Sequence, residues 1–185
     1  MKTFCCLAIA LIVSLPALIA AGPDSSGKEE PKRELPLWGQ PVEGLRLSLR
    51  SAQTKYAVGD KVEVQMVIQN VDTKNRDVVD TDPRLIFEFE VKGPDGKALP
   101  LNKRGKEIQE NPRVFEKMTL RLLKPKEETA FSLELSEFYD LQNPGEYQAT
   151  ASIAVQQQKD TKKWSKLSSN PLTITITEAK EKKDK

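Results

Sequence analysis

Hydrophobic and polar residues alternate along much of the chain, and a period of two is typical of β-strands with one face in a core and the other in water. The pattern covers residues 45–49, 62–68, 85–91, 115–123, 130–135, 147–155 and 172–176, and residues 98–101 are expected as a short return strand. Turn residues, such as the GPDG run at 93–96, separate most of these segments. Because no long helical pattern occurs, the sequence predicts an all-β domain, a single antiparallel β-sandwich of seven to eight strands.

The N-terminus has the organisation of a secretory signal peptide. Lys2 precedes an almost wholly apolar run at 4–19, and small residues follow at 20–22. An uncleaved membrane anchor is the alternative, but Pro16 interrupts the run, which is shorter than the roughly 20 apolar residues that a spanning helix needs. We therefore expect a signal peptide at 1–21, a secreted or periplasmic product, and no membrane span after signal removal.

The remaining chain divides by composition into three parts. Residues 22–36 are rich in proline, glycine and charge, and they are expected to form a disordered linker because they carry little apolar surface. Residues 37–177 hold the alternating segments and form the predicted sandwich. Residues 178–185 are a charged tail, either solvated or able to dock on a partner.

Composition excludes several chemistries. The 185 residues contain two cysteines but no histidine. Without an imidazole, Ser-His-Asp and Cys-His nucleophiles and nearly all catalytic zinc sites are impossible. Cys5 and Cys6 lie in the expected signal peptide, so the mature chain would lack disulfides and thiol nucleophiles. With 29 Lys and Arg against 27 Asp and Glu, the balanced charge predicts no nucleic-acid binding, and no cofactor motif is found.

Three groups of residues resemble the motifs of bacterial immunoglobulin-like modules. They are YAVGDKVEV at 56–64, FEVKGPDGK at 89–97, and LKPKE at 123–127 followed by YDL at 139–141 and PGEY at 144–147. The chain is most similar to the intracellular proteinase-inhibitor type of domain over most of 45–176. The resemblance implies an immunoglobulin-like β-sandwich and makes protease inhibition a hypothesis. Two departures are the expected export and Lys126, which stands where the family's turn usually has glycine.

Two clusters of carboxylates are candidates for a metal-binding or a catalytic site. An acidic connection holds Asp72, Asp77, Asp80 and Asp82, which could bind calcium or be a solvated loop. Glu88 and Glu90 are two residues apart on a strand, so their side chains share one face. They could act as acid and base in a hydrolase, although paired carboxylates of that kind need a cleft, and a charged outer face is the ordinary alternative.

The candidate partner contacts lie in loops and at the margins of the fold. Lys103, Arg104 and Lys106 form a basic cluster in a long loop expected at 102–113, which is either a contact or a protease-sensitive tip. Trp38 and Trp164 are the two tryptophans, and each could plug an end of the sandwich or anchor a partner. Tyr139 is expected to form a tyrosine corner with nearby backbone.

These observations predict an exported, non-enzymatic module that binds a protein or glycan at the cell envelope, with no catalytic, cofactor-binding or metal-binding residue. The alternative is a protease inhibitor that acts through the 102–113 loop.

Overall fold

The computed structural model describes residues 38–110 and 119–179. Contacts within the chain separate residues 1–34 from 35–185, and all described residues belong to the second unit. The expected signal peptide at 1–21 and linker at 22–36 lie outside the described residues, as do positions 111–118 and 180–185. The domain boundaries predicted from composition therefore remain expectations.

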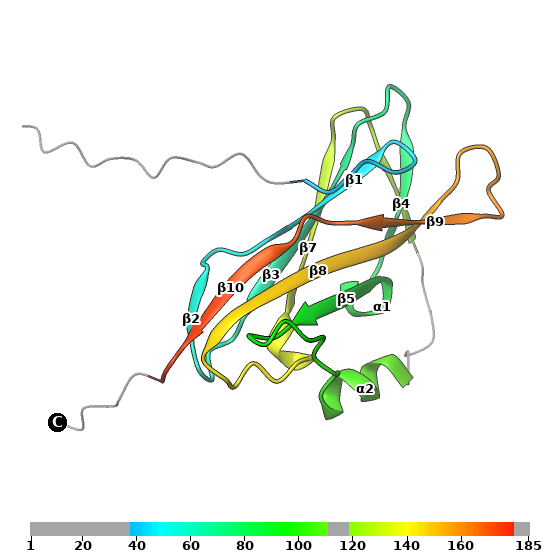
Figure 1. The fold of residues 1–185 in the computed structure, drawn as a ribbon. Helices are drawn as coiled ribbons and strands as arrows, with labels where there is room; N and C mark the ends of the chain where they lie inside the picture. Colours follow the sequence, from blue (N-terminus) through cyan, green and yellow to red (C-terminus); the bar gives the residue numbers. More distant parts are fainter. Residues whose placement is uncertain (1–37, 111–118, 180–185) are drawn as a thin grey trace, which may run out of the picture. The chain divides into compact units, whose positions relative to one another are not determined.

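Two sheets and a two-stranded ribbon make up the domain (Figure 1). The first sheet has the order β1 (Leu45–Arg50), β3 (Glu63–Asn70), β7 (Glu128–Glu134). The second has the order β2 (Lys55–Ala57), β10 (Leu172–Thr177), β8 (Gly145–Gln156), β5 (Phe87–Lys92), and β9 (Trp164–Ser168) also pairs with β8. The ribbon pairs β4 (Arg76–Asp80) with β6 (Thr119–Leu123). The prediction of an all-β, immunoglobulin-like β-sandwich is confirmed.

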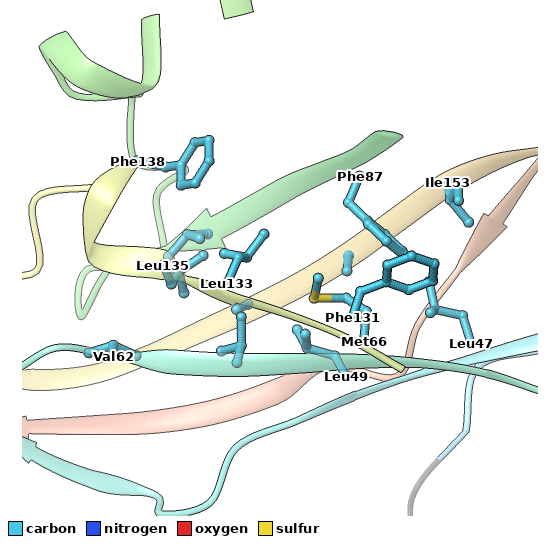
Figure 2. Close-up of a cluster of buried hydrophobic side chains, with 14 of the residues drawn as sticks. Leu47, Leu49, Val62, Met66, Phe87, Phe131, Leu133, Leu135, Phe138 and Ile153 are labelled. Atoms are coloured by element: carbon cyan, nitrogen blue, oxygen red, sulfur yellow. The ribbon is translucent and has the colours of Figure 1, made fainter. Parts of the chain in front are cut away.

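The core lies between the inner faces of the two sheets. Figure 2 shows side chains from β1, β3 and β7 facing those of β5 and β8, and the rings of Phe87 and Phe131 meet edge to face at 5.4 Å. The alternation in the sequence correctly identifies these inward residues: Leu47, Met66 and Ile153 are among those buried. Burial of such side chains supplies the main stabilisation of the domain.

Several predicted strand boundaries are wrong. Residues 85 and 86 belong to a short helix, α1 (Pro83–Ile86), because Asp82 accepts a hydrogen bond from the Arg84 amide as N-cap and proline occupies the first turn. Residues 98–101 form a single bridge rather than a strand, between Ala98 and Lys92. The strands β2, β4 and β9 were missed, because each is short and polar. Among the described strands, every pairing is antiparallel except β2 with β10.

The outer face of β1 is covered, although alternation predicts that water bathes it. Ser48 is fully buried on that face. The guanidinium groups of Arg46 and Arg50, which flank Ser48, lie 4.2 and 5.0 Å from the centre of the Trp38 ring. The Gly39 amide also donates to the Leu47 carbonyl at 2.8 Å. The segment around Trp38 therefore folds over β1.

Two buried asparagines connect the first sheet to neighbouring segments through hydrogen bonds. The Asn70 amide group donates to the carbonyls of Lys74 and Leu123 at 2.8 and 2.9 Å, and its oxygen accepts from the Asp72 amide. Asn170 accepts from the Leu49 amide at 3.0 Å and donates to the Leu49 carbonyl at 3.2 Å. These bonds satisfy backbone groups where the ladders end.

Candidate binding site

A groove of about 550 Å³ is lined by residues of β4, α1, β5, β8 and β9, and it includes part of the outer face of the second sheet. The strand register places its residues: Glu88 of β5 lies opposite Ser152 of β8, and Lys166 of β9 lies opposite Ala154 of β8. Residues directly opposite each other in a sheet share a face, so all four side chains belong to the same outer surface. Trp164 lies two residues before Lys166 on β9 and joins this surface.

The groove has one aromatic wall and one charged wall. Trp164 is 53% exposed, which is large for an indole. The Lys166 ammonium lies 3.3 Å from the Glu88 carboxylate, and this ion pair connects the strands on either side of β8. Leu85 and Ile86 of α1 close another side.

Small side chains form the floor of the groove. Ser152 and Ala154 occupy the outer face of β8 where the neighbouring strands carry Glu88 and Lys166, and all four residues line the groove. The side chains of β8 are therefore small beneath the ion pair, whereas Gln156, directly opposite Trp164, is long. This property arises from three segments far apart in the sequence, which is why the strand patterns did not reveal it.

Beside the groove, the β4–β6 ribbon exposes two leucines. Leu120 and Leu122 of β6 are 65% and 52% exposed. They alternate with Arg121, whose guanidinium reaches back to the Thr129 hydroxyl at 3.1 Å. A small hollow between the ribbon and β8 is lined by Leu120 and Trp164 together, so the ribbon leucine and the indole border the same depression. We call Leu120 and Leu122 the ribbon face.

The prediction of a loop at 102–113 is wrong for most of these residues. Lys103, Arg104 and Lys106 lie on a helix, α2 (Lys103–Glu110), and residues 111–113 lie outside the described residues. The Asn102 oxygen caps this helix by accepting from the Gly105 amide at 2.8 Å. That N-cap was the sequence signal for the helix. All three basic side chains are exposed, and Arg104 pairs with Glu107 at 3.7 Å.

This helix also bears on the inhibitor hypothesis. An inhibitory segment must enter a protease cleft, and the hypothesis required residues 102–113 to be a loop. Because 103–110 are helical, the feature on which that hypothesis depended is not found in the described part of the segment.

The structure separates the candidate partner contacts. Trp38 is half-buried against two arginines of β1, Trp164 borders the groove on β9, and the basic residues lie on α2. Of these predicted contacts, Trp164 alone lines the groove. The sequence pattern indicates neither the pairing of Glu88 with Lys166 nor the exposure of Leu120 and Leu122.

The four aspartates of the acidic connection have separate structural roles. Asp77 and Asp80 lie on β4, and Asp82 caps α1. Asp72 accepts bonds from the amides of Thr73 and Lys74, and the first of these bonds lowers the pKa of its carboxyl group most. Within residues 38–110 and 119–179, no group of three or more His, Cys, Asp or Glu side chains could hold a metal ion.

Glu88 and Glu90 lie on a charged outer face, as the ordinary alternative predicted. Both residues are exposed, and the Glu90 carboxylate lies 3.7 Å from the ammonium of Lys92. They share this face with Lys166, so each carboxylate has its own lysine partner.

The tyrosine corner is formed by a different residue from the one predicted. The Tyr147 hydroxyl donates to the Asn143 carbonyl, four residues upstream, at 2.8 Å. Tyr139 instead donates to the Phe89 carbonyl at 2.6 Å, fifty residues away, and ties its segment to β5. Burial, and secondarily the charge of Glu90, raise the pKa of the Tyr139 phenol.

A family model described as flagellar collar protein C, N-terminal domain, matches residues 51–177. The chain belongs to this family. The match begins directly after β1 and ends at the last residue of β10, so it contains the groove and the ribbon face. No curated protein sequence matches the chain.

Solved structures show a distant resemblance. The C-terminal domain of Wzt is 18% identical with a TM-score of 0.46, and the alignment covers 77% of this chain and 78% of that domain. A mutant β-glucosidase from Listeria innocua, in complex with laminaribiose, is 11% identical with a TM-score of 0.38. The alignment covers 72% of this chain but 16% of the glucosidase. A CARDB domain from Pyrococcus furiosus, in complex with di-metal ions, is 10% identical, with a TM-score of 0.34 and coverage of 82% and 100%.

These similarities have TM-scores below 0.5 and say nothing about the function of this chain. The similarity to the proteinase-inhibitor type of domain is not found among these matches, whereas the immunoglobulin-like fold that it implied is confirmed. Within the described ranges, no helix has the length and hydropathy to cross a membrane.

Proposed function

We propose that the chain is an exported, non-enzymatic module of a collar-type assembly at the cell envelope, and that it binds a protein partner through the ribbon face. The expected signal peptide at 1–21 supports export. The family's name supports a role in a structural assembly around a flagellum. The observation that carries the proposal is the exposure of Leu120 and Leu122 on one strand.

Exposed apolar residues gathered on one element are typical of protein interfaces. Leu120 and Leu122 project from the same face of β6, and Trp164 borders the hollow beside Leu120. An exposed tryptophan next to aliphatic side chains is a frequent centre of binding energy. The ribbon face therefore suits an apolar patch of another protein better than it suits a hydrophilic ligand.

Site-specific photo-crosslinking in living cells tests this function. A photoreactive phenylalanine analogue replaces Leu122, and in a matched strain it replaces Lys55, which is exposed on the short edge strand β2. We expect discrete protein adducts from position 122 and none from position 55. The same adducts should weaken when Leu120→Lys is added. Equal labelling from both positions, or none from position 122, would contradict the proposal.

A further inference from the structure

We infer that the groove beside Trp164 is a binding site for an uncharged saccharide chain, a ligand separate from the protein partner of the ribbon face. The inference combines three observations: a flat, exposed indole, a nearby donor and acceptor, and a floor of small side chains. Each matches a different part of a sugar ring. It goes beyond the proposed function. Because Trp164 and Ala154 also line the hollow beside Leu120, the two proposals are distinguished by their measurements: saccharide binding for the groove, and cross-linking from position 122 for the ribbon face.

The indole of Trp164 supplies the apolar wall. One face of a pyranose ring carries mainly C–H groups, and it packs against a flat aromatic surface with little loss of side-chain freedom. The backbone of Trp164 is held in the β8–β9 hairpin, where the Gln157 amide donates to the Lys163 carbonyl at 2.9 Å. The ring is therefore presented from a rigid element, which reduces the entropy lost on binding.

The ion pair supplies the polar contacts. Sugar hydroxyls both donate and accept hydrogen bonds, so a site needs both kinds of group. The Lys166 ammonium donates and the Glu88 carboxylate accepts, and their side chains remain 66% and 79% exposed even while paired. Each group therefore has open positions for further hydrogen bonds.

The charge of the groove selects against ionic ligands. One lysine and one glutamate line it, and they lie 3.3 Å apart. Their fields largely cancel, so neither a phosphate nor a cation gains strong electrostatic attraction. A ligand with many hydroxyls and no charge satisfies this pair without displacing it.

The small floor decides how deep a ring can lie. Ala154 is exposed on β8, opposite Lys166, and its methyl group leaves the space between the two walls open. A groove of about 550 Å³ is within the range of small-ligand sites. A large side chain at position 154 would fill this space from below without entering the core, because Ala154 faces outward.

The experiment titrates the purified chain with cellohexaose, chitohexaose and mannohexaose, followed by calorimetry and ligand-observed NMR. At least one of these probes should bind, and Trp164→Ala and Ala154→Phe should each weaken binding about tenfold, the loss expected for one stacking contact. The matched control is Gln148→Phe, which places the same ring at an exposed position of the same strand outside the groove. That variant should bind like the parent chain.

Two outcomes would overturn the inference: no binding of any probe, or binding that Ala154→Phe leaves unchanged. If no probe binds and Ala154→Phe also loses the protein adducts of position 122, the groove belongs to the protein partner. Because the cross-linking from position 122 needs no sugar, failure here leaves the proposed function standing, and failure of the cross-linking leaves the saccharide site standing.

Discussion

The two tryptophans of the chain lie on the outer faces of opposite sheets, and their surroundings are opposite. Trp38 is half-buried, with the guanidinium groups of Arg46 and Arg50 against its ring. Trp164 is 53% exposed beside the small Ala154. Long side chains that reach over an indole make it part of the structure, whereas an indole that stays exposed is available to a partner. The comparison teaches that a tryptophan's role is set by whether neighbouring side chains cover its ring.

The covered sheet should be the region most sensitive to mutation. Asn70→Ala removes three hydrogen bonds from a fully buried site and leaves the Lys74 and Leu123 carbonyls unsatisfied. We expect the free energy of unfolding to fall by about 3 kcal/mol. Urea denaturation followed by circular dichroism measures it. A loss below about 0.5 kcal/mol would show that water replaces the asparagine, and the sheet would then be less tightly closed than described.

Replacing each tryptophan by alanine tests the comparison directly. Trp38→Ala should lower the free energy of unfolding by about 2 kcal/mol, since it loses buried area and two cation–π contacts. Trp164→Ala should change the same quantity by less than about 0.5 kcal/mol, as is usual for exposed positions. Thermal and urea unfolding of the pair, side by side, give the difference. Equal losses would remove the distinction between the two faces.

Tyr139→Phe tests the structure through the pH dependence of the free energy of unfolding. It removes the bond to the Phe89 carbonyl and should cost about 1 kcal/mol near neutral pH. Because burial raises the pKa of Tyr139 above its ordinary value of 10.0, the folded state favours the neutral phenol. Stability from this group is complete below pH 10 and is lost as the pH rises through the raised pKa. Unfolding curves between neutral and strongly alkaline pH should therefore fall less steeply for Tyr139→Phe than for the parent chain.

The smallest expected effect is a gain in the free energy of unfolding. Lys126 has a φ of 68° in the turn between β6 and β7, a left-handed conformation that glycine adopts more readily. Lys126→Gly should raise the free energy of unfolding by about 0.5 kcal/mol, net of the greater entropy of the unfolded chain. Glu127→Gly, in the same turn, is the contrasting variant and should not stabilise. A destabilised Lys126→Gly would indicate that the lysine side chain contributes more than the backbone strain costs.

Sequence periodicity predicts the core well because the core depends on local alternation. Leu45, Leu47 and Leu49 are buried as the pattern requires. Periodicity does not predict the coverage of Ser48, since Trp38 reaches it from outside the strand. Short polar strands such as β4 carry too few alternating positions to be recognised. Asp82 and Asn102 are residue types that favour a helix N-cap, but α1 and α2 were not predicted from them.

The groove could not be derived from the sequence, for a different reason. It exists because Glu88, Ala154 and Trp164 meet on one surface, and their meeting depends on the register of β5 and β9 against β8. Register is set by the packing of the whole sheet rather than by any one segment. Of the groove residues, Trp164 alone was proposed as a partner contact from the sequence, because an exposed tryptophan is informative by itself.

The parallel pairing of β2 with β10 has a consequence for biogenesis. Tyr56 lies beside Ile176, so an early segment of the domain can complete its ladder only after the chain has been synthesised past residue 177. Until then Tyr56, which is buried in the finished domain, has no neighbour on that side. A nascent chain stalled before residue 172 would expose this margin to chaperones and proteases, which makes the last strand the step that commits the domain to its final form.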